Sequence, residues 1–178
     1  MVMGLALRDR DYHTYADYLT WPEDVRYELI DGTAYMMAPA PNLDHQEIAG
    51  EIFFQLRRAL EGKPRRAFVA PVDVRLPKAD ESDEQIDTVV QPDVVVEVLS
   101  PATAGHDHLL KRRTYERAGV KEYWLVHPSD RLLTVYRRTV DRFGEPQMQE
   151  LIGSTPVAVL PGVEIAWNEL VARLSPPD

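Results

Sequence analysis

The segment Gln91-Pro-Asp-Val-Val-Val-Glu-Val-Leu-Ser100 decides the fold, because its valine run predicts a β-strand in which two acids are embedded. Side chains alternate along a strand, so its odd-numbered residues share one face and its even-numbered residues share the other. A valine content this high is typical of a strand that is buried on both faces of a sheet. We therefore expect the rest of the chain to be arranged around this strand.

Asp93 and Glu97 lie on the same face of the predicted strand. A carboxylate in a buried strand is unfavourable unless a metal ion, a lysine or hydrogen bonds compensate its charge. The two acids are therefore the first candidates for a functional site. The alternative is that they cap backbone groups at the end of the strand and have no chemical role.

A polar turn follows the strand and leads into a predicted helix over residues 104–118. Asp107, Lys111 and Tyr115 are spaced four residues apart and so lie on one stripe of that helix. If the helix packs near the end of the strand, the Lys111 ammonium can lie close to Glu97 and beside a bound phosphate. The alternative is an exposed Asp107–Lys111 pair that contributes about 0.3 kcal/mol.

The segments before the strand predict a hairpin and a long helix. Residues 12–19 predict a short amphipathic helix, and Asp31-Gly32 between two apolar runs predicts a β-hairpin that contains Glu28. An apolar stripe with a period of four residues predicts a helix over residues 42–60, with Asn42 or Asp44 as its N-cap and His45 in its first turn. Further strands are expected at residues 67–70 and 72–76, followed by an acidic connection over residues 77–87.

The segments after the helix add more strands and a short terminal helix. Strands are expected over residues 122–126, 132–138 and 148–152, and a helix over residues 167–174. This order of elements predicts an α/β fold with a mixed central sheet and one principal helix on each side. Residues 1–178 contain no repeat or low-complexity segment and are expected to form a single domain.

Composition narrows the class of protein. The net charge is −9 and the pI is near 5.0, which speaks against a protein that coats nucleic acid electrostatically. Basic residues do gather in clusters at 57–58, 63–66, 111–113 and 137–138, although each cluster alone is typical of a solvated face. Without cysteine, a metal must be held by oxygen or histidine ligands. No apolar run is long enough to cross a membrane, so we expect a cytoplasmic protein.

Several passages, in this order, resemble the bacterial Uma-type restriction endonucleases, a branch of the PD-(D/E)XK nuclease superfamily. The passages are Tyr27-Glu-Leu-Ile-Asp-Gly32, His45-Gln46, Val72-Asp-Val-Arg-Leu76, Asp87-Thr-Val-Val-Gln-Pro-Asp93, Val96-Glu-Val-Leu-Ser-Pro101, Asp107 with Lys111 and Tyr115, and Ala118-Gly-Val-Lys-Glu-Tyr-Trp124. Each passage is weak alone. Their common order is specific, and it implies a restriction-endonuclease-like fold.

The resemblance implies an endonuclease that hydrolyses DNA phosphodiester bonds with magnesium, or with manganese in its place. Glu97 matches the acidic residue of the (D/E)XK element, and Asp93 is the second expected metal ligand. The lysine of that element is replaced by Leu99, and Lys111 on the following helix matches it instead. Glu28 matches an auxiliary acid of the opening hairpin. A homodimer is also expected, because symmetric cutting requires two sites.

The chain departs from the family pattern at the decisive strand. The family has two Pro-Asp strands here, whereas this chain has one strand that opens like the first and closes like the second, as if a hairpin were missing. Asp93 and Glu97 are four residues apart, which separates their Cα atoms by roughly 13 Å in a regular strand. Two ligands of one magnesium ion need carboxylate oxygens about 3 Å apart. Either the strand bends, or another acid such as Asp73 or Glu28 completes the site.

Two other functions fit the sequence. A nuclease-fold protein that has lost catalysis can serve as a DNA-binding or protein-interaction module, which the acidic balance and the shortened strand region favour. A metal-dependent hydrolase built on His45, His106, His108 and His127 is the third alternative. These histidines lack the close helical spacing of a zinc site, which argues against it.

Overall fold

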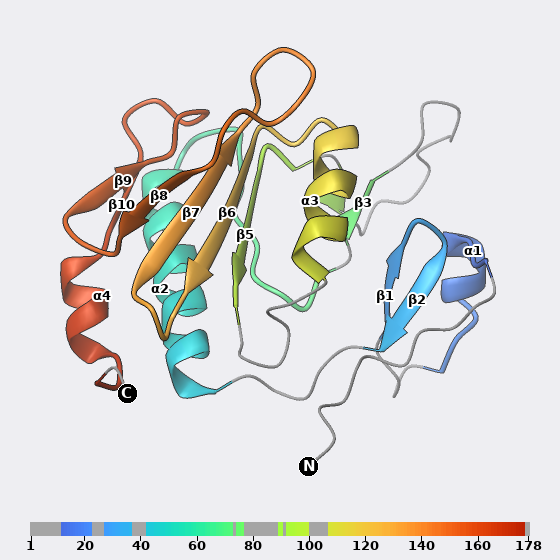
Figure 1. Ribbon diagram of the computed structural model, residues 1–178, viewed down its shortest axis with the longest axis horizontal. Coiled ribbons are helices and arrows are strands. Elements are labelled where there is room, and N and C mark those ends of the chain that lie inside the picture. Colours follow the sequence, from blue (N-terminus) through green and yellow to red (C-terminus); the bar gives the residue numbers. More distant parts are fainter. Residues whose placement is uncertain are drawn as a thin grey trace.

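A mixed four-stranded sheet with one helix on each face forms the body of the protein (Figure 1). The computed structural model describes residues 12–22, 27–36, 42–72, 74–76, 89–90, 92–99 and 107–176. The sheet has the order β5 (Val94–Val98), β6 (Glu122–His127), β7 (Leu132–Arg137) and β8 (Gln147–Glu150). Helix α2 (Leu43–Ala59) covers one face, and helix α3 (Asp107–Arg117) covers the other. This arrangement confirms the predicted α/β fold.

Strand β5 runs parallel to β6 in an unbroken register, from Val94 opposite Glu122 to Val98 opposite Val126. The pairs β6–β7 and β7–β8 are antiparallel. Among the strands that the structure describes, only β6 pairs with β5, so β5 lies at an edge of this sheet and its residues are half-buried. Strand β6 is the deeply buried strand instead. The valine run therefore predicted the strand correctly, but the expected burial on both faces belongs to its neighbour.

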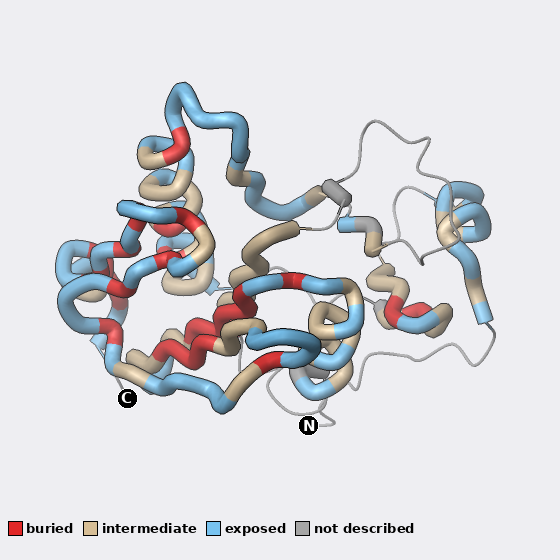
Figure 2. The backbone as a smooth tube through the Cα atoms, turned by 90° about the horizontal axis from the view of Figure 1, so that it is seen from above, coloured by how far each residue is buried: buried red, intermediate tan, exposed pale blue. Residues whose placement is uncertain are grey.

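The alternation of side chains in β5 divides the apolar core in two. The even-numbered valines of β5 pack with the face of α2 that carries Ile48 and Ile52. On the other face, Val95 and Leu99 pack with Tyr115 of α3 and with a smaller cluster around Tyr123. Figure 2 shows the buried residues concentrated along the central strands. Each helix is thus fixed on its own face of the sheet.

Helix α2 has the predicted extent because its first turn is capped as the sequence suggested. Asn42 is the N-cap, and its side chain accepts a hydrogen bond of 3.0 Å from the backbone N–H of His45. Arg57 and Arg58 lie in its last turn, where positive charge offsets the helix dipole. The helix ends at Ala59 with Leu60 as C-cap.

A two-stranded hairpin lies beside α3, separate from the central sheet (Figure 1). Its strands β1 (Tyr27–Ile30) and β2 (Thr33–Met36) are joined by Asp31 and Gly32, whose φ angles are +50° and +76°. Positive φ at both turn residues is the type I′ geometry that the Asp-Gly pair predicted. Helix α1 (Tyr15–Tyr18) is shorter than expected, because Thr14 and Asp17 form a capping box that starts it later.

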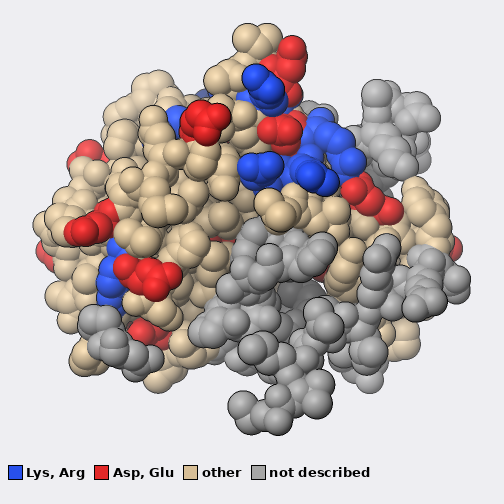
Figure 3. All heavy atoms as spheres, in the orientation of Figure 1, with Lys and Arg blue, Asp and Glu red and all other residues tan. Residues whose placement is uncertain are grey.

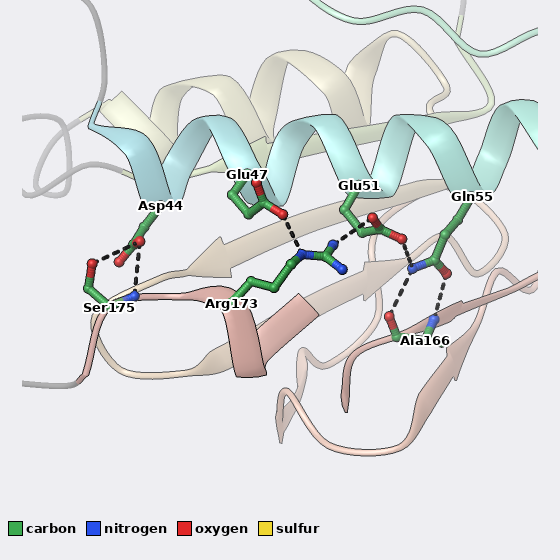
Figure 4. A network of polar contacts seen from close by, with 7 residues as sticks. All are labelled: Asp44, Glu47, Glu51, Gln55, Ala166, Arg173 and Ser175. Carbon is green, nitrogen blue, oxygen red and sulfur yellow. Dashed lines mark hydrogen bonds and ion pairs between the residues drawn. The ribbon is translucent and has the colours of Figure 1, made fainter. Parts of the chain in front are cut away.

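The C-terminal part of the chain crosses over to α2 and completes the larger core. Strands β9 (Ser154–Pro156) and β10 (Glu164–Ala166) form a hairpin that the sequence did not predict, and α4 (Asn168–Arg173) follows. Arg173 pairs with Glu47 at 2.5 Å and with Glu51 at 2.7 Å. Figure 4 shows these contacts together with those of Asp44 with Ser175 and Gln55 with the backbone of Ala166. The terminal segment is therefore fixed to α2 along several of its turns.

One predicted strand is wrong. Residues 67–70 form no strand, and Phe68 and Val69 are about half exposed. The neighbouring strand is limited to β3 (Val74–Arg75), which pairs in parallel with β4 (Val89–Val90). The acidic connection at 77–87 and the candidate acid Asp73 lie outside the described residues. No helix in the described part of the chain is long and apolar enough to span a membrane.

Candidate active site around Glu97 and Lys111

Glu97 is held by two tyrosine hydroxyls in the layer between β5 and α3. The hydroxyl of Tyr123, on the neighbouring strand β6, donates to Oε2 of Glu97 at 2.8 Å. The hydroxyl of Tyr115, on α3, donates to Oε1 at 3.2 Å. The Glu97 side chain is only 17% exposed. These hydrogen bonds compensate a carboxylate that would otherwise be costly in a half-buried strand.

Lys111 joins Glu97 to the hairpin. Its Nζ lies 2.9 Å from Oε2 of Glu28 and 3.6 Å from Oε1 of Glu97, and its side chain is also 17% exposed. Lys111 and Tyr115 are one turn apart on α3, so the same stripe of the helix brings both to Glu97. The sequence predicted this stripe, and the structure brings Glu28, Glu97 and Lys111 together. The side chain of Asp107 lies outside the described residues.

The donor set of this cluster suits a hard cation. Among the described residues, two carboxylates share one ammonium, which leaves one negative charge in excess to attract a cation. Magnesium in phosphate-processing sites is commonly held by one or two carboxylates, with water and phosphate oxygens in the remaining positions. Glu97 and Glu28 can supply those carboxylates. No group of three or more acidic or histidine side chains with metal-binding geometry occurs within the residues that the structure describes.

Asp93 belongs to a different cluster. Its carboxylate lies 2.5 Å from Nζ of Lys121 and 2.9 Å from Nε of Arg65. Hydrogen bonds from Lys121 and then from Arg65 lower the pKa of Asp93, and its backbone oxygen accepts from the N–H groups that begin β6. The unbroken register of β5 keeps the Cα atoms of Asp93 and Glu97 roughly 13 Å apart. Asp93 as a second metal ligand therefore stays a prediction, and its contacts place it with other partners.

His45 lies near the end of β5 that carries Glu97, on the side of α2. Its Nδ1 is buried and has no hydrogen-bond partner within the described residues. Burial lowers the pKa of His45, and backbone groups of Val98 and of His45 itself raise it in part. The histidine is therefore favoured in its neutral form. Within the described residues, His45 belongs to no group of three or more histidine or acidic side chains that could hold a metal ion.

Tyr123 is the site residue that the sequence analysis did not single out. Its position on β6 could have identified it as a partner of Glu97. Tyr123 pairs with Val95 in the parallel register of β5 and β6, so Tyr123 points to the same face of the sheet as Val95 and Glu97. A tyrosine so placed is completely buried and needs an acceptor for its hydroxyl. The parallel pairing had to be known before this reasoning was available.

Comparison with known proteins identifies the family to which the chain belongs. The family model Uma2, described as "Putative restriction endonuclease", matches residues 15–168. This protein belongs to the Uma2 family. The match includes Glu28, Glu97 and Lys111, and it confirms the family to which the sequence passages pointed.

A solved structure supports the Uma2 assignment at the level of the fold. The crystal structure of a "putative nuclease belonging to DUF820" from Anabaena variabilis ATCC 29413 superimposes with a TM-score of 0.68. The alignment covers 89% of this chain and 97% of that one at 20% sequence identity. This Uma2 protein therefore has the restriction-endonuclease-like fold. A search of curated proteins gave no match.

Proposed function

We propose that this Uma2-family protein is a metal-dependent endonuclease that hydrolyses phosphodiester bonds in DNA. The observation that carries the proposal is the Lys111 ammonium, which lies within 3.6 Å of carboxylates from two separate elements, β5 and the hairpin. An ammonium beside paired carboxylates is an arrangement that serves both a divalent cation and a phosphate. The family model and the fold agree with a nuclease.

Each residue of the cluster would have a separate role in catalysis. Glu97, with Glu28 as auxiliary acid, would hold magnesium, or manganese in its place. The bound cation would supply an activated water and charge neutralisation at the phosphate. Lys111 would stabilise the negative charge that develops on the phosphate oxygens in the transition state. Tyr115 and Tyr123 fix the direction of the Glu97 carboxylate, because each donates to one of its two oxygens.

The test is a cleavage assay on supercoiled and single-stranded DNA with magnesium or manganese. Glu97→Gln and Lys111→Met are compared with Glu169→Gln and Arg142→Gln, which remove the same charges from exposed positions away from the cluster. We expect a loss of at least about 100-fold for the first pair, the range seen when a donor to the transition state is removed. The control pair should cleave like the wild type. Cleavage that survives both Glu97→Gln and Lys111→Met would remove the assigned site.

Asp93 is tested in the same assay. If Asp93 contributes a ligand after a rearrangement of the strand, Asp93→Asn should raise the magnesium concentration needed for half-maximal cleavage. If only Glu97 and Glu28 hold the metal, that concentration should change for Glu28→Gln and not for Asp93→Asn. The magnesium titration therefore decides which acid accompanies Glu97.

The second candidate function is a DNA-binding or protein-interaction module that has lost catalysis. One observation favours it: the described residues contain only two carboxylates at the Lys111 ammonium and no third metal ligand beside them. DNA binding without cleavage under any metal condition would support this alternative. Metal-dependent cleavage that Glu97→Gln abolishes would exclude it.

A further inference from the structure

A second cluster of charges, away from Glu97, lies at the C-terminal end of α2. Four basic side chains line a hollow of about 360 Å³, and the only acid in its lining is Glu61. The four are Arg57, Lys63, Arg65 and Arg66. We propose that this basic hollow binds a backbone phosphate of duplex DNA. The choice of DNA as the polyanion rests on the proposed function, but the hollow itself is separate from the proposed catalytic cluster.

The hollow is formed by the way in which α2 ends. Gly62 has a φ of +71°, a left-handed conformation that reverses the chain after the helix. The N–H of Lys63 then donates to the carbonyl of Leu60 at 3.0 Å, which closes the turn. The segment after this turn therefore returns across the end of α2, and its three cations meet Arg57 of the last helical turn.

Compensation of the helix dipole does not by itself account for the number of basic side chains at the end of α2. Arg57 and Arg58 alone place two positive charges in the last turn, where they offset the helix dipole. Lys63, Arg65 and Arg66 add to them in a chain whose net charge is −9. Within the described residues, no carboxylate forms an ion pair with Arg57, Lys63 or Arg66. Gathered cations repel one another, and an anionic ligand would relieve that repulsion.

Two of the cations are positioned before any ligand arrives. Arg65 is held by Asp93 at 2.9 Å, and the same carboxylate holds Lys121 at 2.5 Å, which extends the positive surface toward β6. The guanidinium of Arg66 lies 5.1 Å from the centre of the Phe68 ring, which is 50% exposed. Side chains fixed in this way lose less conformational entropy when they bind a ligand.

A second group of basic side chains on the described surface, near α3, makes contacts within the protein. Figure 3 shows Lys and Arg side chains interleaved with acids near α3. There Arg117 pairs with Asp31 at 2.5 Å, and Arg138 donates to the carbonyls of Glu116 and Asp141. These contacts satisfy guanidinium groups within the protein. The basic hollow is therefore the better candidate for an external anion.

The basic hollow is connected to the strand that carries Glu97. Arg65 of the hollow pairs with Asp93, which immediately precedes β5. A duplex presents phosphates along both of its strands, so DNA bound at Glu97 has further phosphates available to a second basic surface of the protein. The contact would position the substrate without reading its sequence.

The experiment measures binding and needs no cleavage. A fluorescent duplex is titrated with the full-length Glu97→Gln protein without divalent metal, between 50 and 200 mM NaCl. Arg57→Gln with Arg66→Gln is compared with Arg58→Gln with Arg142→Gln, a control pair that removes the same charge from exposed positions outside the hollow. Each lost phosphate contact lowers the salt slope of the binding constant by about 0.9. Because the hollow binds one phosphate, we expect the hollow pair to reduce the slope by about 1 and the control pair to leave it unchanged.

Two outcomes would overturn the inference. Equal reductions in both double variants would mean that net charge alone governs binding. No measurable binding of the duplex, together with thermal stabilisation by 10 mM inorganic phosphate that the hollow pair loses, would mean a small-anion site only. Lys63→Gln provides a second variant in the hollow, and thermal unfolding shows whether each protein is folded. If the hollow binds DNA but Glu97→Gln leaves cleavage intact, the assigned catalytic cluster is wrong and this inference stands. If Glu97→Gln abolishes cleavage but the hollow pair binds DNA like the control pair, the catalytic cluster stands and this inference is wrong.

Discussion

Glu97 can remain charged in a half-buried strand because each of its oxygens has its own donor. Tyr115 and Tyr123 donate from two different elements, and Lys111 adds a positive charge from the same helix as Tyr115. Asp93, which immediately precedes β5, is compensated by Lys121 and Arg65 instead. The two acids thus have separate environments, and only Glu97 is near the hairpin acid Glu28.

Tyr123→Phe removes the shorter of the two hydrogen bonds to Glu97 and keeps the ring in its core. If Glu97 is the metal ligand, its carboxylate loses its fixed direction, and we expect the rate of cleavage at saturating DNA to fall about 10-fold, equivalent to a hydrogen bond of about 1.4 kcal/mol. The DNA concentration for half-maximal rate should change little. Tyr136→Phe is the control, since Tyr136 stacks on Tyr123 at 6.1 Å between ring centres. An equal effect of both variants would indicate a packing effect alone.

Asp93→Asn should change the pH dependence of stability. The pKa of Asp93 is lowered below its ordinary value of 3.8 in the folded protein by Lys121 and Arg65. A lowered folded pKa gives stability that is present above the unfolded pKa and is lost as the pH falls through the folded pKa. The side chain is 31% exposed, so we expect the variant to lose only about 0.5–1 kcal/mol at pH 7. Urea unfolding at pH 7 and pH 3 checks this, because the difference from wild type should shrink at pH 3.

Strand β6 is the element that joins the two halves of the fold. It pairs with β5 on one side and with β7 on the other, and it places Tyr123 toward α3 and Trp124 toward α2. Its first residue, Glu122, is 1% exposed. The Glu122 carboxylate accepts from the backbone N–H of Val159 at 2.8 Å and from Nε1 of Trp124 at 3.0 Å. A buried acid therefore connects the central sheet to the C-terminal segment.

Glu122→Ala leaves the buried Trp124 Nε1 and the half-buried N–H of Val159 without an acceptor, and Nε of Arg137, 3.4 Å from the carboxylate, loses its neighbouring charge. We expect a loss of about 3 kcal/mol in the free energy of unfolding, the usual result of breaking a buried charged network. Glu122→Gln keeps an acceptor oxygen and should cost less. Chemical denaturation of the two variants measures the difference. A loss below 1 kcal/mol for the alanine variant would contradict the anchoring role.

At the scale of the whole molecule, the C-terminal segment completes the core that α2 began. Trp167 is fully buried beside Ile165 and Leu170, and its Nε1 donates to the hydroxyl of Thr155 at 2.7 Å. Arg173 then fixes α4 to the polar side of α2 (Figure 4). The larger core therefore depends on residues that are distant in the chain, from Ile48 of α2 to Leu174. The predicted homodimer is a separate question, which the mass of the protein in solution would answer.

Trp167→Ala removes the largest side chain that the C-terminal segment contributes to this core. We expect a loss of about 3–5 kcal/mol, because the site loses apolar contact and a cavity remains. Val140→Ala serves as the control, since Val140 is almost fully exposed and should change stability by less than about 0.5 kcal/mol. Thermal unfolding of both variants distinguishes them. Equal midpoints for Trp167→Ala and wild type would show that the terminal segment adds nothing to the core.

Local signals determined much of this protein. The Asp31-Gly32 turn, the Asn42 cap, the valine strand and the Lys111–Tyr115 stripe each depend on residues within a few positions, and each occurs as the sequence predicted. The family passages also pointed to the fold that the comparisons confirm. The expected strand at 67–70 failed because β-propensity alone does not supply an apolar surface on which to pack.

Only the tertiary structure decided which charges meet. The ion pair of Asp93 with Lys121 and the hydrogen bond from Tyr123 to Glu97 arise between residues that are distant in the chain, and the basic hollow depends on the chain reversal at Gly62. Pairing register and chain reversal fix these contacts to within a few ångströms, and electrostatic partnership depends on such distances. Sequence periodicity specifies a face of an element but not what lies opposite that face.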